Sequence, residues 1–185
     1  MLRYRLTAGL VALALTVTPS MSIRPAQASS AAEINRDANT VLATLYEKHP
    51  DAKKLAAKAK AILVFPTIYK AGFMFGAQYG EGVLRRGNKS VGYYNTLAAS
   101  YGWQAGAQAF GYALFFMNDS ALSYLDKSEG FEVGLGPSIV VLDEGMGKSM
   151  TSSTVTQDIY AIIFDQKGLM AGAGIQGSKI SKIDK

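Results

Sequence analysis

The sequence predicts an α+β fold, in which a strongly bent antiparallel β-sheet closes into a barrel-like core and carries N-terminal helices and one short mid-chain helix. Three observations lead to this expectation: glycine-spaced stretches with the period of a strand, helical apolar stripes near the N-terminus, and short apolar runs between turn residues. The chain has 185 residues, of which 49% are hydrophobic, enough for one domain with its own core.

The first 28 residues are predicted to be a secretory signal peptide. Arg3 and Arg5 precede an apolar run over residues 6–18, and Ala26-Gln27-Ala28 has the small residues of a cleavage site. We therefore expect a signal peptide at 1–28, a single domain at 29–185, and export to the periplasm or envelope. The sequence has no cysteine, so we expect neither a lipid anchor at the cleavage site nor a disulfide framework.

Two helices are predicted at the start of the mature chain. The first covers Ala31 to Lys48, because Ser30 and Glu33 form a capping box and His49-Pro50 ends the pattern. Its apolar stripe should pack on the sheet and comprises Ile34, Ala38, Val41, Leu42 and Leu45. The second helix, AKKLAAKAKA, follows Asp51 as a cap and is basic and amphipathic, which suits either an anionic membrane or a solvated surface.

Glycine recurs along Ala71 to Leu84 and again along Tyr101 to Phe116. Read as a strand, the first stretch has an almost bare face with all four of its glycines and an aromatic face with Phe73, Phe75 and Tyr79. Glycine at such positions indicates a bend, a bulge or the close approach of another backbone. A membrane helix is the alternative, but nearby charges leave no run of about 18 uncharged apolar residues.

The other elements follow from short apolar runs and turn residues. Arg85-Arg86-Gly87-Asn88 predicts a hairpin turn, and Pro66 is expected to end the strand before it. Residues 165–168 are predicted to form a tight turn and residues 143–156 a loop. Asn118 or Asp119 can cap a short helix that ends before Gly130. The further predicted strands cover residues 62–65, 90–95, 131–142, 159–164 and 169–175.

No pattern of catalytic or metal-binding residues stands out. His49 is the single histidine and lies at a helix end, where a cation is favourable, and without cysteine a zinc site is not expected. Gly172 to Gly177 matches G-x-G-x-x-G, but the sequence has no room after it for the required helix and acidic strand. The acidic residues lack EF-hand spacing. We expect a non-enzymatic protein without cofactor or metal.

Positive charge is concentrated in one segment. Loss of the leader would remove three arginines and lower the formal charge from +5 to +2, yet 48–89 holds nine basic residues against Asp51 and Glu81. Such a segment can attract an anionic partner, although a charge run can also be a solvated face. The candidate lipid-binding residues are Lys53, Lys54, Lys58, Lys60, Lys70, Arg85, Arg86 and Lys89.

Several motifs occur in the order typical of one family. They are AKAILVFP at 59–66, KAGF at 70–73, GEGVLRR at 80–86, GWQAGAQ at 102–108, GLGP at 134–137 and KGLMAGAGIQG at 167–177. Over about Leu55 to Ile180 the chain thereby resembles the SYLF domain family. The resemblance implies phospholipid binding, of phosphoinositides in some members, and actin binding in some fungal members. The family motifs cover four of the candidate residues, namely Lys60, Lys70, Arg85 and Arg86.

The sequence thus predicts an exported phospholipid-binding protein of a bacterial envelope. Its lysines and arginines would attract anionic phospholipid headgroups, and apolar groups of the first helices would insert into the membrane or bury an acyl chain. We expect neither nucleic acid nor, in a bacterial compartment, actin as a partner. Two alternatives remain open: an envelope protein-interaction module that uses the same basic face, and a small lipid carrier that holds an acyl chain between its glycine faces.

Overall fold

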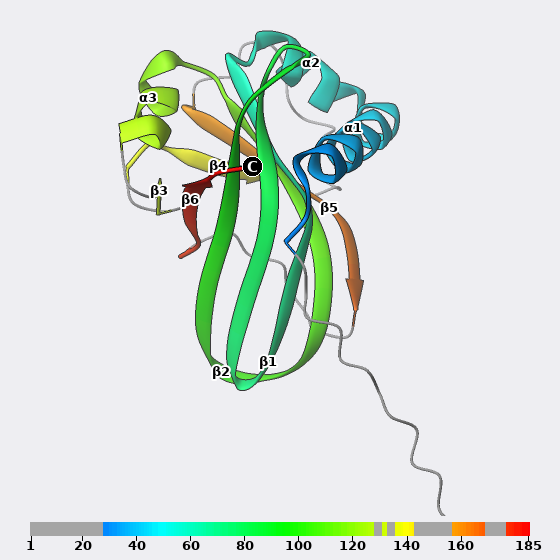
Figure 1. Ribbon diagram of the computed structural model, residues 1–185, viewed down its shortest axis with the longest axis vertical. Helices are drawn as coiled ribbons and strands as arrows, with labels where there is room; N and C mark the ends of the chain where they lie inside the picture. Colours follow the sequence, from blue (N-terminus) through cyan, green and yellow to red (C-terminus); the bar gives the residue numbers. More distant parts are fainter. Residues whose placement is uncertain (1–27, 128–130, 133–135, 143–156, 169–176) are drawn as a thin grey trace, which may run out of the picture.

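The computed structural model describes residues 28–127, 131–132, 136–142, 157–168 and 177–185 (Figure 1). Within these ranges the chain is α+β, with three helices and a six-stranded mixed sheet. The helices are α1 (Ala31–Lys48), α2 (Pro50–Lys58) and α3 (Asp119–Lys127). The strands are β1 (Ala61–Arg86), β2 (Lys89–Phe116), β3 (Phe131–Glu132), β4 (Ile139–Leu142), β5 (Ile159–Gly168) and β6 (Lys179–Ile183).

The centre of the fold is a long antiparallel ribbon made by β1 and β2. The two strands pair from Ala61 with Phe116 to Arg86 with Lys89, and the predicted hairpin turn joins them. Gly87 occupies this turn with φ +58°, a left-handed conformation that glycine adopts without strain. The hairpin prediction is therefore confirmed, and its strands are far longer than the sequence indicated.

This ribbon folds back on itself near its middle. Met74 has φ +61°, and the pairing register shifts between Phe73 and Phe75. A Cβ atom on Gly72 would lie 2.5 Å from the Cα atom of Gly76, so the bend closes around bare backbone. Figure 1 shows both strands running from the helical end to the bend and returning. We call residues 61–72 with 106–116 the first arm, and 76–86 with 89–100 the second arm.

The two arms approach each other closely because one face of the second arm carries glycine. A Cβ atom on Gly82 would lie 2.4 Å from the carbonyl oxygen of Val64 and 2.7 Å from Cδ1 of Phe65. Real Cβ atoms do not approach backbone oxygens so closely, and any larger residue would force the arms apart. The expectation that these glycines mark a bend and a close backbone approach is confirmed.

The sheet is not closed, so the predicted barrel-like closure is not supported. Its hydrogen-bonded order is β3-β6-β2-β5-β4, with β1 also paired to β2. β2 pairs with β6 through its second-arm half and with β5 through its first-arm half. β4 and β5 are parallel, so the sheet is mixed rather than antiparallel throughout. The reason is that curvature is taken up in one sharp bend instead of being spread around a ring of strands.

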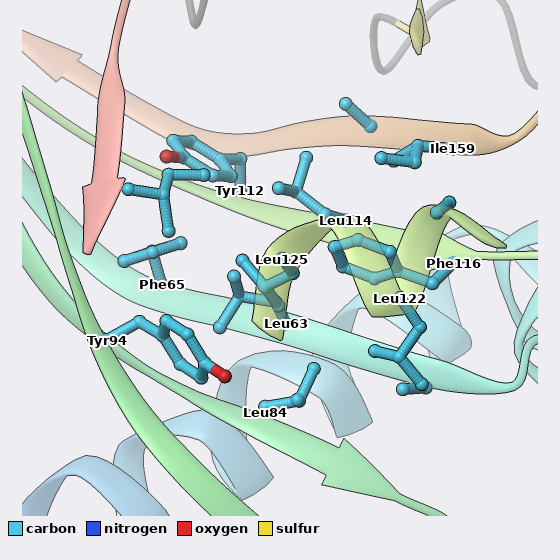
Figure 2. Packing of buried hydrophobic residues seen from close by; sticks show 14 of the residues in the cluster. Leu63, Phe65, Leu84, Tyr94, Tyr112, Leu114, Phe116, Leu122, Leu125 and Ile159 are labelled. Atoms are coloured by element: carbon cyan, nitrogen blue, oxygen red, sulfur yellow. The ribbon is translucent and has the colours of Figure 1, made fainter. Parts of the chain in front are cut away.

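Two apolar clusters lie on opposite faces of the first arm and β5. Alternate side chains divide between them, as the two-residue period of a strand requires: Leu63 and Phe65 belong to one cluster and Val64 to the other. The first cluster packs against α3 and also contains Leu84 and Tyr94 of the second arm (Figure 2). The second cluster packs against the buried stripes of α1 and α2.

The helix predictions are confirmed, with changes at both ends of α2. The hydroxyl of Ser30 and the carboxylate of Glu33 form the expected capping box of α1. Asn118 caps α3, since its side-chain oxygen accepts from the backbone N–H of Ala121 at 2.8 Å. α2 begins at Pro50 rather than after Asp51, because proline is well suited to the first helical position. It ends at Lys58, and Ala61, the last residue of the predicted helix, is the first residue of β1.

Several strand boundaries were predicted wrongly. Pro66 does not break β1, because a register shift between Phe65 and Ile68 accommodates it. Residues 165–168 continue β5 instead of turning, with an irregularity at Asp165, whose φ is +53°. The predicted strand 131–142 is divided into β3 and β4, which pair with different strands. The loop 143–156 and the strand 169–175 lie outside the described residues, and β6 was not predicted.

The close approach of the arms gives a stability prediction. Gly82→Ala should lower the free energy of unfolding by about 1–3 kcal/mol, because its methyl group overlaps the Val64 carbonyl and the Phe65 ring. Urea unfolding measures this. The control is Ala99→Val at an exposed strand position, which should stay within about 0.5 kcal/mol of wild type. An unchanged unfolding midpoint for Gly82→Ala would contradict the close approach.

Candidate functional site: an uncharged ribbon tip and its lysines

The structure places the eight candidate basic residues in three regions. Lys53, Lys54 and Lys58 lie exposed on α2, and Lys60 follows directly after this helix. Arg85, Arg86 and Lys89 flank the hairpin turn. Figure 1 shows α2 and this turn at one end of the longest axis and the bend of the ribbon at the other. Lys70 stands apart from the other seven, a few residues before the bend.

Several cations of this helical end already have partners. The ammonium of Lys54 lies 2.9 Å from a carboxylate oxygen of Asp51, and that of Lys60 lies 4.0 Å from Asp119. The guanidinium of Arg85 donates to the side-chain oxygen of Asn39 on α1 and, at 3.1 Å, to the carbonyl of Asn88. Arg85 therefore fastens the turn to α1, which is a structural role.

The first helices do not supply apolar groups for membrane insertion. The apolar side chains of α1 and α2 are buried against the sheet, among them Leu42, Leu45 and Leu55. Exposed positions on α2 hold proline, lysine or alanine. The prediction that apolar groups of these helices insert into a membrane is therefore wrong, because their apolar stripes pack against the sheet.

Large apolar side chains are exposed instead at the bend of the ribbon. Phe73 is 74% exposed, Phe75 is 70% exposed, and the neighbouring Tyr69 is 68% exposed. Met74, at the left-handed position of the bend, is also exposed. We call residues 71–78 with 98–107 the ribbon tip. The glycines at 72 and 76 allow β1 to reverse here, and the reversal turns these side chains outward.

The ribbon tip carries no charge. No acidic or basic residue occurs between Lys70 and Glu81 in β1, or from Ser90 to Asn118 along β2 and the residues after it. Exposed aromatic groups without nearby charges are unusual on a water-soluble surface and indicate contact with an apolar partner.

Lysines lie where the tip meets the body of the protein. Lys70 of β1 is paired with Gln108 of β2, which is paired in turn with Gly168 of β5. The neighbouring residue of β2, Ala109, is paired with Lys167 of β5. On the second arm, Lys179 of β6 is paired with Leu97, with Glu132 of β3 as its other neighbour. We call Lys70, Lys167 and Lys179 the lysine collar. Lys70 is partly buried and the other two are exposed.

The dimensions of the tip fit a bilayer interface. Lys70 and Met74 are four residues apart, which corresponds to roughly 13 Å along a strand. A hydrocarbon core is about 30 Å thick, so the tip is too short to span it. Within the described residues, the outer edge of β2 has no strand partner from 98 to 107, and unpaired backbone groups are costly in hydrocarbon. Shallow insertion is the depth that this geometry permits.

A cleft of about 430 Å³ lies between the start of α1 and the two arms. Pro66, Tyr69, Tyr79 and Gly80 line it together with acidic Asp37 and Glu81. The glycine faces at 72 and 82 are occupied by neighbouring backbone, so they leave no room for an acyl chain there. The lipid-carrier alternative gains no support from these positions.

The described residues show neither a metal-binding cluster nor a membrane-spanning helix. Among them, no group of three or more histidine, cysteine or acidic side chains is arranged to hold a metal ion. In the same part of the chain, no helix is both long and apolar enough to cross a bilayer.

The sequence contained a signal for the tip that charge counting overlooked. The glycines at 72 and 76 flank two aromatic residues, and this pattern was sufficient to predict an exposed bend. Residues 90–118 also contain no acidic or basic residue. Lys167 and Lys179 were missed because they reach the collar only through the pairing of β5 and β6 with β2.

Exposure of the tip can be tested by stability alone. Phe73→Ala should change the free energy of unfolding by no more than about 0.5 kcal/mol, because the ring already contacts water. Phe110→Ala, a matched change at a buried position of the same ribbon, should cost about 3–5 kcal/mol. Chemical denaturation measures both. Equal losses for the two variants would show that Phe73 is packed rather than exposed.

Comparison with known proteins identifies part of the chain. Residues 97–185 match the family model described as "Ysc84: Las17-binding protein actin regulator". A comparison with curated proteins found no match. The matched range contains most of β2, α3 and the strands β3 to β6, and it agrees with the resemblance seen in the sequence motifs. Residues 97–185 are therefore similar to the Ysc84 family, which confirms the resemblance to the SYLF domain family for this part of the chain.

Proposed function

We propose that this is an exported, non-enzymatic protein that binds phospholipid membranes of a bacterial envelope through its ribbon tip. The observation that carries the proposal is the exposure of Phe73, Met74 and Phe75 on an uncharged tip above the lysine collar. The match of residues 97–185 to a family associated with lipid and actin binding supports a lipid partner. Actin is not part of the proposal, because the predicted leader directs the chain to a bacterial envelope.

In this mechanism the tip and the collar have separate roles. The aromatic rings and Met74 enter the interfacial region and leave water, which stabilises the bound state by about 25 cal/mol per Å² of apolar surface. The collar then lies at the level of the phosphate groups, where a basic residue contributes about 1 kcal/mol at an anionic surface. Anionic phospholipids, phosphoinositides among them, are the expected ligands, and salt should weaken this part of the binding.

The position of the tip also determines which cations reach the membrane, those of the helical end or those of the lysine collar. Because the helical end and the tip lie at opposite ends of the longest axis, a protein that stands on its tip holds α2 away from the same membrane (Figure 1). The basic residues of α2, which are also among the candidates from charge counting, therefore serve as an internal comparison.

Vesicle binding tests the proposal. Phe73→Ser with Phe75→Ser should weaken co-sedimentation of residues 29–185 with anionic vesicles roughly tenfold or more, since about 1.4 kcal/mol corresponds to a factor of ten. Lys70→Gln with Lys167→Gln should weaken binding at low salt, by about the same factor, and have little effect at high salt.

The matched control changes charge at the other end. A variant with Lys53, Lys54, Lys58 and Lys60 replaced by Gln should bind nearly as well as wild type. If this variant loses binding while the tip variant retains it, the membrane contact lies on α2 and the tip proposal is wrong. Absence of binding to every vesicle would favour the envelope protein-interaction module. Concentration-dependent dimers that the tip variant abolishes would assign the tip to a second copy of the chain.

A further inference from the structure

A nearly buried carboxylate receives the segment where the predicted leader ends. Glu81 lies on the second arm of β1, and its side chain is only 8% exposed. The backbone nitrogen of Ser29 donates to Oε2 of Glu81 at 3.0 Å, and the hydroxyl of Tyr79 donates to Oε1 at 2.8 Å. The ammonium of Lys185 lies 3.0 Å from the same Oε2.

Lys185 closes this group of contacts. Its side chain is 10% exposed, and its ammonium also donates to the carbonyl oxygen of Ser29 at 2.7 Å. Ser29 is therefore held through both its nitrogen and its carbonyl, directly before Ser30, the cap of α1. Burial would raise the pKa of Glu81, but hydrogen bonds from Lys185 and Tyr79, the Lys185 charge and the Ser29 N–H lower it overall. The carboxylate is ionised at neutral pH.

The predicted cleavage site is the bond between Ala28 and Ser29, so cleavage would free the same Ser29 nitrogen that donates to Glu81. Hydrolysis of the Ala28–Ser29 bond by a signal peptidase adds one water, leaves a carboxylate on Ala28 and frees an amine on Ser29. An α-amine has a pKa near 8 and takes up a proton at neutral pH. An amide N–H that donates one hydrogen bond would thus become an ammonium, and hydrogen bonds between charged partners are stronger than neutral ones.

We propose that Glu81 is the acceptor for the mature N-terminus, so that removal of the leader creates a Ser29 ammonium–Glu81 ion pair that the precursor lacks. The pair joins the start of α1 to β1 and, through Lys185, to the segment after β6. This inference rests on the proposed export and cleavage but not on membrane binding, so failure of the vesicle experiment would leave it standing.

Thermal unfolding of two chains with different starts tests the pair. A chain that starts at Ser29 should have a melting temperature about 5 °C above one that starts at Gln27, which keeps the Ser29 N–H but moves the charge away. In the Glu81→Gln variant, the chains that start at Ser29 and at Gln27 should have the same melting temperature. In Asp37→Asn, which changes an acid of the same cleft that lies beside Arg36, the difference should persist.

A second measurement needs no variant. In the folded chain that starts at Ser29, acylation of the α-amine at neutral pH should be about tenfold slower than in a peptide of the same first residues, because a paired ammonium is a poor nucleophile. Equal melting temperatures of the two wild-type chains, or equal acylation rates of the folded chain and the peptide, would overturn the proposal. So would mass spectrometry of the exported protein that finds a mature N-terminus other than Ser29.

Discussion

The whole architecture depends on contact between the two arms of one β-ribbon. Because glycine replaces side chains at positions such as 82, the backbone of the second arm can lie against the carbonyl of Val64 and the ring of Phe65. That contact brings Leu84 and Tyr94 into the core with the first arm and α3 (Figure 2). It also fixes where the ribbon must reverse, and hence which residues are displayed at the tip. Core packing and the exposed site are consequences of the same constraint.

The molecule therefore has two dissimilar ends. Helices bury their apolar stripes at one end and leave lysines in water, whereas the ribbon at the other end exposes aromatic rings without any charge. A membrane contact at the tip needs no rearrangement of the helices, since no buried side chain has to leave the core. The collar is built by three different strands, so its geometry depends on the pairing of β1, β5 and β6 rather than on a local motif.

Local signals predicted the local structure well. The capping box at Ser30 and Glu33, the turn at Gly87 and the cap at Asn118 each rest on contacts within a few residues, and each is present. The course of the sheet depends on distant pairing, which periodicity does not encode, so closure, strand direction and β6 were missed or wrong. The same limit applies to the site: charge counting found Lys70 but not the exposed aromatic tip, because the reversal that exposes Phe73 is a property of the folded ribbon.

The continuous pairing of β1 with β2 has a consequence for the order of folding. The turn at Gly87 brings Arg86 and Lys89 together at almost no cost in chain entropy, and each further pair extends a ladder that already exists. Ala61 and Phe116, far apart in the sequence, thus meet by stepwise zippering rather than by closure of a long loop. The reversal at Met74 lies midway along this path. Zippering must pass through the bend before the first arm can form and offer its two faces to the helices.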